Sequence, residues 1–298
     1  MDPSNYTDWY QFELSLGSLN KKCVEKIFNR HNAASITYSD AGTEPIYEPL
    51  PGKTPYWKNS LITGLFSIDT DFESLKYDLL ISLEIKELPE HTVKKLIGRE
   101  WEREWMKDFK PMCFGRNLWI YPEEYSGQSK GKVIVRLDPG LAFGTGTHST
   151  TKLCLEWLDS LDLENKSILD YGCGSGILGI SALKLGASKV TAIDIDPQAI
   201  KATTINALKN NIEKNIFVYD KINDSSEKYD VIVANILAEP LIMLAPLLTK
   251  MLKRNGIIGI SGILISQFKL IENAYRSFVT FDSSSHHNEW SLICGSKK

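Results

Sequence analysis

The chain has 298 residues, of which 43% are hydrophobic and 24% charged, a composition that excludes disordered, collagen-like and disulfide-scaffold proteins. Its 34 basic and 37 acidic residues give a formal charge of −3, so no net positive field attracts nucleic acid nonspecifically. The five cysteines form no C-x-x-C pair, and we expect neither zinc nor another metal. Because no apolar run reaches the ~18 residues of a membrane helix and no leader is recognised, a cytoplasmic protein without a membrane segment is expected.

Residues 1–97 have the pattern of a small antiparallel sheet with helices. Strand-like and helical stretches follow in the order strand, helix, strand, strand, helix, strand, over residues 10–16, 19–30, 34–38, 61–67, 71–83 and 92–97. Asp71 stands where it can cap the second helix. The order is that of the split βαβ, or ferredoxin-like, arrangement. Since nothing in it resembles a chemical site, residues 1–97 are predicted to recognise a substrate.

Residues 98–110 are predicted to form a linker helix. Trp101, Trp105 and Phe109 recur every four residues and therefore share one helix face, while the charged residues between them face water. Aromatic stripes usually bury area, so we expect this helix to pack against one or both domains.

Residues 111–298 alternate strands with helices, which is typical of a parallel sheet with crossover helices. Five strands, at 167–171, 189–194, 216–219, 230–234 and 256–261, are separated by helices at 177–185, 197–211 and 237–252. Two further strands, at 277–281 and 289–294, follow each other without a helix and should pair antiparallel. We predict an α/β fold: a doubly wound, seven-stranded sheet with a reversed C-terminal hairpin.

A glycine-rich loop follows the first strand of this sheet. Counted from Gly174, it matches the dinucleotide motif G-x-G-x-x-G through Gly179, with Asp194 about 20 residues further on, so a nicotinamide dehydrogenase is an alternative. That motif places its first glycine at the strand end, and counted from Gly172 the third glycine falls on Ile177. The register therefore argues against a dehydrogenase.

Two other features favour S-adenosylmethionine as the ligand. Asp170 precedes the glycines as D-x-G-x-G-x-G, which suits a ligand with a cationic ammonium and no pyrophosphate. A second segment, residues 138–151, is rich in glycine and hydroxyl groups and flexible enough to close over a bound molecule.

Polar side chains end two other strands at the edge of the sheet where doubly wound folds bind ligands. Asp194 is predicted to accept both hydroxyls of a ribose, whereas Asp196 fits the start of the next helix better. Asn235 offers an amide that can accept an N–H bond without ionising. A helix N-cap is its alternative role, and the two are compatible.

At this point the sequence resembles the methyltransferases of the large-subunit ribosomal protein L-eleven (L11), a family of class I S-adenosylmethionine-dependent enzymes. The most specific motif is DPGLAFGTGTH at 138–148. Supporting motifs, spread over nearly the whole chain, are EPLPG at 48–52, WEREW at 101–105, LDYGCGSGIL at 169–178, IDIDPQA at 193–199 and NILA at 235–238.

The resemblance implies a substrate-recognition domain over 1–97, a linker helix over 98–110 and a methyltransferase domain over 111–298. It further implies trimethylation of the N-terminal α-amine and lysine ε-amines of ribosomal protein L11. The contacts to S-adenosylmethionine would be Thr151, Gly172, Asp194 and Asn235, with Asn235 also positioning the reacting amine. A monomer without direct nucleic-acid binding is expected.

Two positions depart from the family pattern, which usually has proline at Ser149 and alanine at Gly179. Neither change removes an implied contact. Phe143 and Gly144 would belong to the loop that closes the site. His148 is expected to be a structural hydrogen-bonding residue, and no obligate general base is predicted.

Other acceptors and classes stay open as alternatives: an N-methyltransferase for another protein, a nucleic acid or a small amine, or an assembly protein that has lost catalysis. Nucleic-acid amine methyltransferases resemble one another in an Asn-Pro-Pro-aromatic motif, whose aromatic residue stacks on a flipped base. Here Ile-Leu-Ala follows Asn235, which argues against a nucleic acid.

Overall fold

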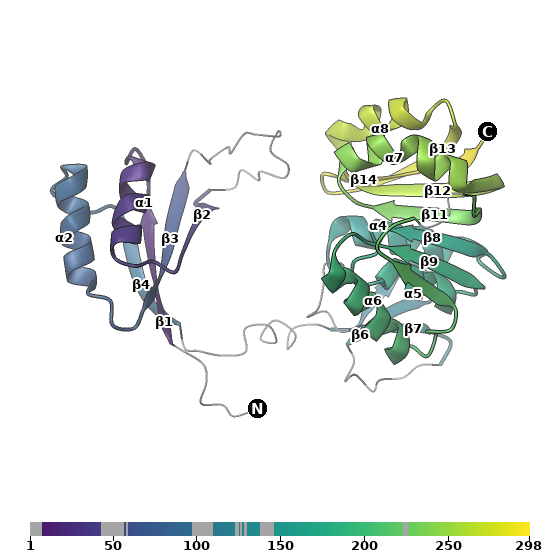
Figure 1. The fold of residues 1–298 in the computed structure, drawn as a ribbon, viewed down its shortest axis with the longest axis horizontal. Coiled ribbons are helices and arrows are strands. Elements are labelled where there is room, and N and C mark those ends of the chain that lie inside the picture. The colour runs from purple at the N-terminus through teal and green to yellow at the C-terminus, as the bar shows by residue number, and fades with distance from the viewer. Residues whose placement is uncertain are drawn as a thin grey trace. The chain divides into compact units, whose positions relative to one another are not determined.

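The computed structural model describes residues 8–42, 57, 59–96, 110–122, 125, 127, 130–137, 146–222 and 226–298. The chain divides into two compact units, Met1–Glu104 and Trp105–Lys298 (Figure 1). Apart from Lys110, the predicted linker helix lies outside the described residues. The linker helix and the domain boundaries at 97 and 110 therefore stay predictions.

The first unit has the predicted strand and helix order. Its elements are β1 (Trp9–Ser15), α1 (Lys21–Arg30), β2 (Ser35–Asp40), β3 (Ser60–Ser67), α2 (Phe72–Leu83) and β4 (His91–Leu96). The strands form one antiparallel sheet in the order β2-β3-β1-β4, which confirms the ferredoxin-like arrangement. Alternate residues of β1 and β3, including Phe12, Leu14 and Phe66, pack with Val24 and Leu75 of the two helices.

Asp71 caps α2 as the sequence predicts. Its carboxylate accepts hydrogen bonds from the backbone N–H groups of Glu73 and Ser74, each at 3.1 Å. These donors have no partner within the helix, so the cap determines where α2 begins.

The second unit is built on the predicted seven-stranded sheet. Its strands are β8 (Ser167–Tyr171), β9 (Lys189–Ile193), β10 (Ile216–Tyr219), β11 (Tyr229–Asn235), β12 (Leu252–Leu264), β13 (Val279–His287) and β14 (Trp290–Lys297). Their order is β10-β9-β8-β11-β12-β14-β13. The first five pair in parallel, and β14 pairs antiparallel with both β12 and β13. This topology confirms the class I methyltransferase sheet with a reversed hairpin.

Helices cover both faces of this sheet. They are α4 (Ser149–Ser160), α5 (Ile177–Lys184), α6 (Pro197–Lys209), α7 (Ala238–Met251) and α8 (Phe268–Tyr275). One core joins α4 and α5 to one face, and a second core joins α7 and α8 to the other. Neither α8 nor a small additional sheet is predicted by the sequence.

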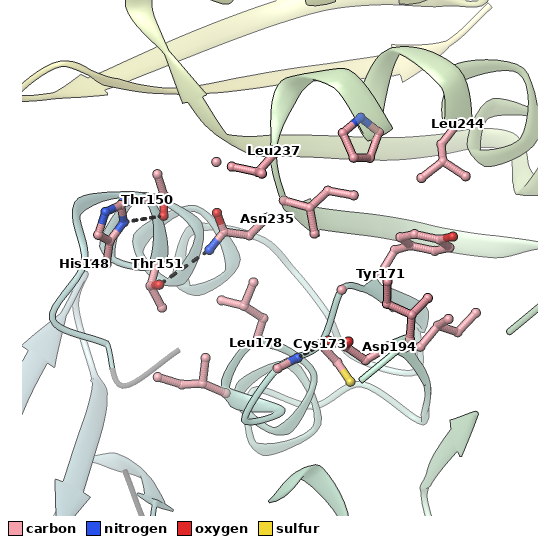
Figure 2. Close-up of a pocket in the computed structure, with 18 of the residues that line it drawn as sticks. His148, Thr150, Thr151, Tyr171, Cys173, Leu178, Asp194, Asn235, Leu237 and Leu244 are labelled. Carbon is pink, nitrogen blue, oxygen red and sulfur yellow. Dashed lines mark hydrogen bonds between the residues drawn. The ribbon is translucent and has the colours of Figure 1, made fainter. Parts of the chain in front are cut away.

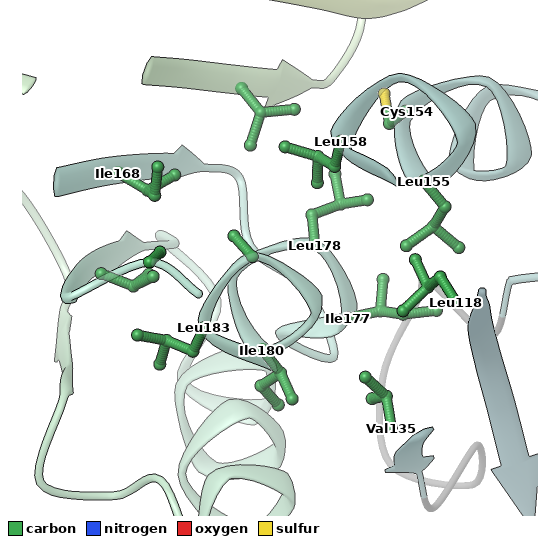
Figure 3. Packing of buried hydrophobic residues seen from close by; sticks show 14 of the residues in the cluster. Leu118, Val135, Cys154, Leu155, Leu158, Ile168, Ile177, Leu178, Ile180 and Leu183 are labelled. Atoms are coloured by element: carbon green, nitrogen blue, oxygen red, sulfur yellow. The ribbon is translucent and has the colours of Figure 1, made fainter. Parts of the chain in front are cut away.

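That additional sheet consists of β5 (Met112–Phe114), β6 (Leu118–Pro122) and β7 (Val133–Leu137), in the order β5-β6-β7. Its apolar side chains extend the core of the methyltransferase sheet: Leu118 and Val135 belong to the same buried cluster as Leu155 of α4 and Ile177 and Ile180 of α5 (Figure 3). The segment therefore supports the two helices that lie beside the glycine-rich loop.

Candidate functional site

A cavity of about 580 Å³ lies where β8, β9 and β11 end (Figure 2). Its volume is within the roughly 300–1,000 Å³ of small-molecule sites. All four residues predicted to bind the ligand line it: Thr151, Gly172, Asp194 and Asn235. They come from four separate segments: Gly172, Asp194 and Asn235 lie at the carboxyl ends of parallel strands, and Thr151 lies in the first turn of α4.

Gly172 begins the loop after β8 in a conformation that favours glycine. Its φ is +77°, and its N–H donates to the carbonyl of Ile193 at 2.7 Å. A Cβ at this position would collide with the side chain of Ile236, which also lines the cavity. Glycine therefore keeps the turn unstrained and lets the turn pack against Ile236 at the wall of the cavity.

Asp194 lies directly after β9 with its carboxylate held by the backbone. The N–H of Gly174 donates to one oxygen at 2.9 Å, and the N–H of Asp196 donates to the other at 3.0 Å. A carboxylate has about four lone-pair positions, so both oxygens can still accept from ligand hydroxyls. Asp196 caps α6 by accepting from the N–H of Gln198 at 2.8 Å, as predicted.

The sequence pattern places Asp170 beside the ligand, but the structure places it in the core. It is completely buried and is not among the described residues that line the cavity, so it makes no direct contact with a ligand there. Its Oδ2 accepts from the N–H of Gly179 at 2.8 Å. Burial raises the pKa of this carboxyl to about 7. Asp170 therefore ties α5 to the end of β8.

Asn235 and Thr151 form a pair on the other side of the cavity. The Asn235 side-chain N–H donates to the Thr151 hydroxyl at 3.4 Å (Figure 2). The pair joins the end of β11 to the first turn of α4. The alternative role of Asn235 as a helix N-cap is wrong, because Leu237 occupies that position of α7 without a side-chain bond.

His148 is the N-cap of α4 and also lines the cavity. Its Nδ1 accepts from the Thr150 hydroxyl at 2.8 Å and from the Thr150 N–H at 3.4 Å. Burial lowers the pKa of His148, which favours the neutral ring. With Nδ1 accepting, the proton of that ring is on Nε2. The predicted structural hydrogen-bonding role is confirmed.

The cavity residues that were not identified from the sequence include Tyr171, Gly262 and Trp290. Gly262 has a φ of +84°, and a Cβ there would collide with the backbone of Ile236. Trp290 begins the last strand, and only the topology of the sheet brings it beside His148. A glycine inside a strand signals close backbone approach, so Gly262 could have been found, whereas Trp290 carried no local signal.

Two absences hold for the described residues alone. No group of three or more histidine, cysteine or carboxylate side chains there is placed to hold a metal ion. None of the helices in these parts of the chain has the length and apolar composition needed to span a bilayer. The closing loop around Phe143 and Gly144 lies outside the described residues, and its role stays a prediction.

Comparisons of sequence and of structure give the same family, and the sequence comparisons cover nearly the whole chain. The family model "Ribosomal protein L11 methyltransferase (PrmA)" matches residues 8–298. Ribosomal protein L11 methyltransferases of Salmonella newport (strain SL254) and Salmonella dublin are 45% and 44% identical over 295 residues, covering 97% of this chain and 99% of each relative. A ribosomal protein L11 methylase structure from Lactobacillus delbrueckii subsp. bulgaricus has a TM-score of 0.59 and 37% identity, covering 64% of this chain and 100% of that one.

Proposed function

Because this chain belongs to the ribosomal protein L11 methyltransferase family, we propose that it methylates the N-terminal α-amine and lysine ε-amines of ribosomal protein L11, using S-adenosylmethionine. The products are trimethylated nitrogens. The observation that carries the proposal is one cavity with two kinds of lining: a glycine turn with a fixed carboxylate, and an amide–hydroxyl pair. We also infer that the protein works as a monomer in the cytoplasm, where ribosomal proteins are made.

The residues present fit S-adenosylmethionine. Gly172 lines the cavity with main-chain atoms alone, and the Asp194 carboxylate can accept from ribose hydroxyls. The neighbouring Ile195 and Leu244 offer apolar surface to a nucleoside base. When bound, S-adenosylmethionine supplies a methyl group on a positively charged sulfur, whose C–S bond breaks as the C–N bond to the acceptor forms.

Asn235 is the residue that we assign to the acceptor amine. Its side-chain N–H is directed to Thr151, so its carbonyl oxygen is the atom that can accept from an amine N–H. A carbonyl oxygen binds a neutral amine without stabilising the protonated form as strongly as a carboxylate would. Among the described residues lining the cavity, Asp194 is the only carboxylate, and two backbone N–H groups already donate to it.

The acceptor must lose a proton before it reacts, and this cost differs between the two kinds of amine. At pH 7, deprotonation costs about 4.6 kcal/mol for a lysine with a pKa near 10.4 and about 1 kcal/mol for an α-amine near 7.7. Burial in an apolar cavity lowers the pKa of an amine and so reduces this cost. The Nδ1 of His148 is engaged by Thr150, so we assign proton release to water and not to His148.

Intact-mass spectrometry of ribosomal protein L11 tests the proposed function. After incubation with the enzyme and S-adenosylmethionine, its mass is expected to rise in steps of one CH₂ group. Asn235→Ala should lower kcat by about 100-fold, because the amine loses its positioning contact, while S-adenosylmethionine still raises the melting temperature. An unmodified L11 beside a methylated small amine or nucleic acid would overturn the proposed substrate.

His148→Asn is the matched variant for the absence of a general base. Asparagine keeps a good N-cap for α4 but removes the imidazole. We expect most of the activity to remain and the pH profile to keep its shape. Lost activity at unchanged cofactor affinity would instead identify His148 as a base.

A further inference from the structure

Trp290 lines the same cavity as His148, Thr151 and Asn235. It is the first residue of β14 and pairs with Leu264 of β12 and His287 of β13. Its ring lies edge-on to the His148 ring, with centroids 4.8 Å apart and an interplanar angle of 69°. An aromatic side chain of the cavity wall therefore lies at the start of α4, the helix that carries Thr151, the partner of Asn235.

Contacts between the β13–β14 hairpin and α4 hold Trp290 at this place. The Ser149 hydroxyl lies 3.0 Å from Nδ1 of His287 and accepts from the Asn288 side-chain N–H at 3.3 Å. Asn288 has a φ of +55°, the left-handed conformation of a tight turn. Together with the His148 contact, these bonds join the hairpin to the first turn of α4, which also carries Thr151.

Repeated methylation changes which contacts can hold the amine. Each added methyl group replaces an N–H, so a neutral dimethylamine has no N–H left to donate to Asn235. The trimethylated nitrogen has neither an N–H nor a lone pair and keeps its positive charge. Hydrogen bonding to the amine therefore weakens with each step, whereas attraction of methyl groups and positive charge to an aromatic face increases.

We propose that Trp290 holds the partly methylated amine through its ring face and so determines how many methyl groups are added before the substrate is released. This inference rests on the proposed function, because it concerns the same acceptor amine. Ser149, His287 and Asn288 are positioning residues, since they act through the placement of the hairpin. Asn235 holds the unmethylated amine, and Trp290 takes over as its N–H groups are replaced.

Binding measurements separate this role from a general loss of structure. Enzyme saturated with S-adenosylhomocysteine is titrated with unmethylated and with fully methylated ribosomal protein L11. Trp290→Leu should weaken binding of the methylated form by about threefold to tenfold, the range of a partly exposed cation–π contact, and change binding of the unmethylated form less. Phe217→Leu is the control, because Phe217 is an aromatic residue of the same sheet, on β10, that is not among the lining residues.

The distribution of products gives a second readout. Trp290→Leu should accumulate mono- and dimethylated nitrogens in conditions where the wild type yields trimethylated ones, and Trp290→Phe should restore part of the third step. Ser149→Ala should shift the distribution in the same direction as Trp290→Leu, by a smaller amount. Equal distributions and equal affinity ratios in the wild type and in Trp290→Leu would overturn the inference.

If Trp290→Leu does not fold, a third measurement uses a change that keeps the shape of the side chain. Fluorinated tryptophan at position 290 has a less negative ring face and nearly the same shape as tryptophan. The affinity for methylated L11 should therefore fall with each fluorine atom added. An unchanged affinity would contradict the role of Trp290. A wild-type enzyme that leaves L11 unmodified would contradict the proposed function instead, so the two failures are distinguishable.

Discussion

At the scale of single residues, Gly172 makes the most specific requirement on the site. Its positive φ costs any other residue about 1–2 kcal/mol, and a Cβ would in addition collide with Ile236 on the wall of the cavity. Gly131 has a similar φ of +74°, but no atom lies within 4 Å of the place that its Cβ would take. A substitution at Gly131 therefore tests backbone strain without a collision.

We therefore expect Gly172→Ala to abolish the thermal stabilisation by S-adenosylmethionine, whereas Gly131→Ala keeps it. A ligand at a hundred times its Kd stabilises a protein by about 2.7 kcal/mol, so the difference in melting temperature is easily measured. Both variants should lose some stability without ligand. Normal cofactor binding by Gly172→Ala would show that the glycine serves only the turn.

Asp170 provides a test through pH. Its pKa in the folded chain is raised to about 7, against about 3.9 in an unfolded chain. As pH rises between these values, the unfolded state loses its proton while the folded state keeps it. The free energy of unfolding should therefore fall, by up to ~1.4 kcal/mol per pH unit, and level off above pH 7.

Asp170→Asn removes this contribution, because an amide does not titrate. Denaturant unfolding at a series of pH values should give a shallower decline between pH 4 and 7 in the variant than in the wild type. Asp230 has the opposite effect on stability, because its pKa is lowered to about 2, but this effect is confined to pH values below about 4. Parallel curves for the two proteins would refute a raised pKa at Asp170.

At the scale of elements, local sequence patterns identified those strands and helices whose residues alternate or repeat clearly. β3 alternates buried with more exposed residues over its eight positions, β1 does so from Gln11 to Ser15, and the Asp71 cap fixes the start of α2. By contrast, β5 has three residues and β7 five, and both are stabilised by packing against α4 and α5, which are distant in the sequence. Short strands with such partners leave little local pattern to detect.

The site divides in the same way. Gly172, Asp194 and Asn235 end strands, so the rule that ligands bind at the carboxyl edge of the sheet was enough to group them. The burial of Asp170 and the position of Trp290 depend on which helix or strand packs against each, and nothing within a few residues of either one encodes that. Their places required the structure.

Asp71→Ala tests the element that the sequence located best. Loss of an N-cap carboxylate typically costs about 0.5–2 kcal/mol, and the Glu73 and Ser74 N–H groups would lose their acceptor. Asp69→Ala is the matched control, since it removes an exposed aspartate two residues away that caps no helix. The melting transition of the first unit should shift in Asp71→Ala and stay in place in Asp69→Ala. Equal shifts would mean that the cap contributes nothing measurable.

At the scale of the whole molecule, the two units are predicted to divide recognition from chemistry. All described cavity residues belong to Trp105–Lys298, so this part expressed alone should still be stabilised by S-adenosylmethionine. Its KM for ribosomal protein L11 should rise about tenfold or more, because a docking contact of ~1.4 kcal/mol or more is lost. Steady-state kinetics on both lengths of chain measure this. An unchanged KM would remove the assignment of residues 1–97 to substrate recognition.

The strand order of the larger sheet has a consequence for how this protein is made. β14 follows β13 in the sequence, yet it lies between β12 and β13 in the sheet and carries Trp290. During synthesis, β13 emerges before the strand that must separate it from β12, so the sheet cannot close until β14 has emerged as well. Pairings of this long-range kind form late in folding. A nascent chain from which β14 has not yet emerged therefore lacks one wall of its own cavity, and a stop codon placed before β14 should yield an enzyme whose cavity has no Trp290.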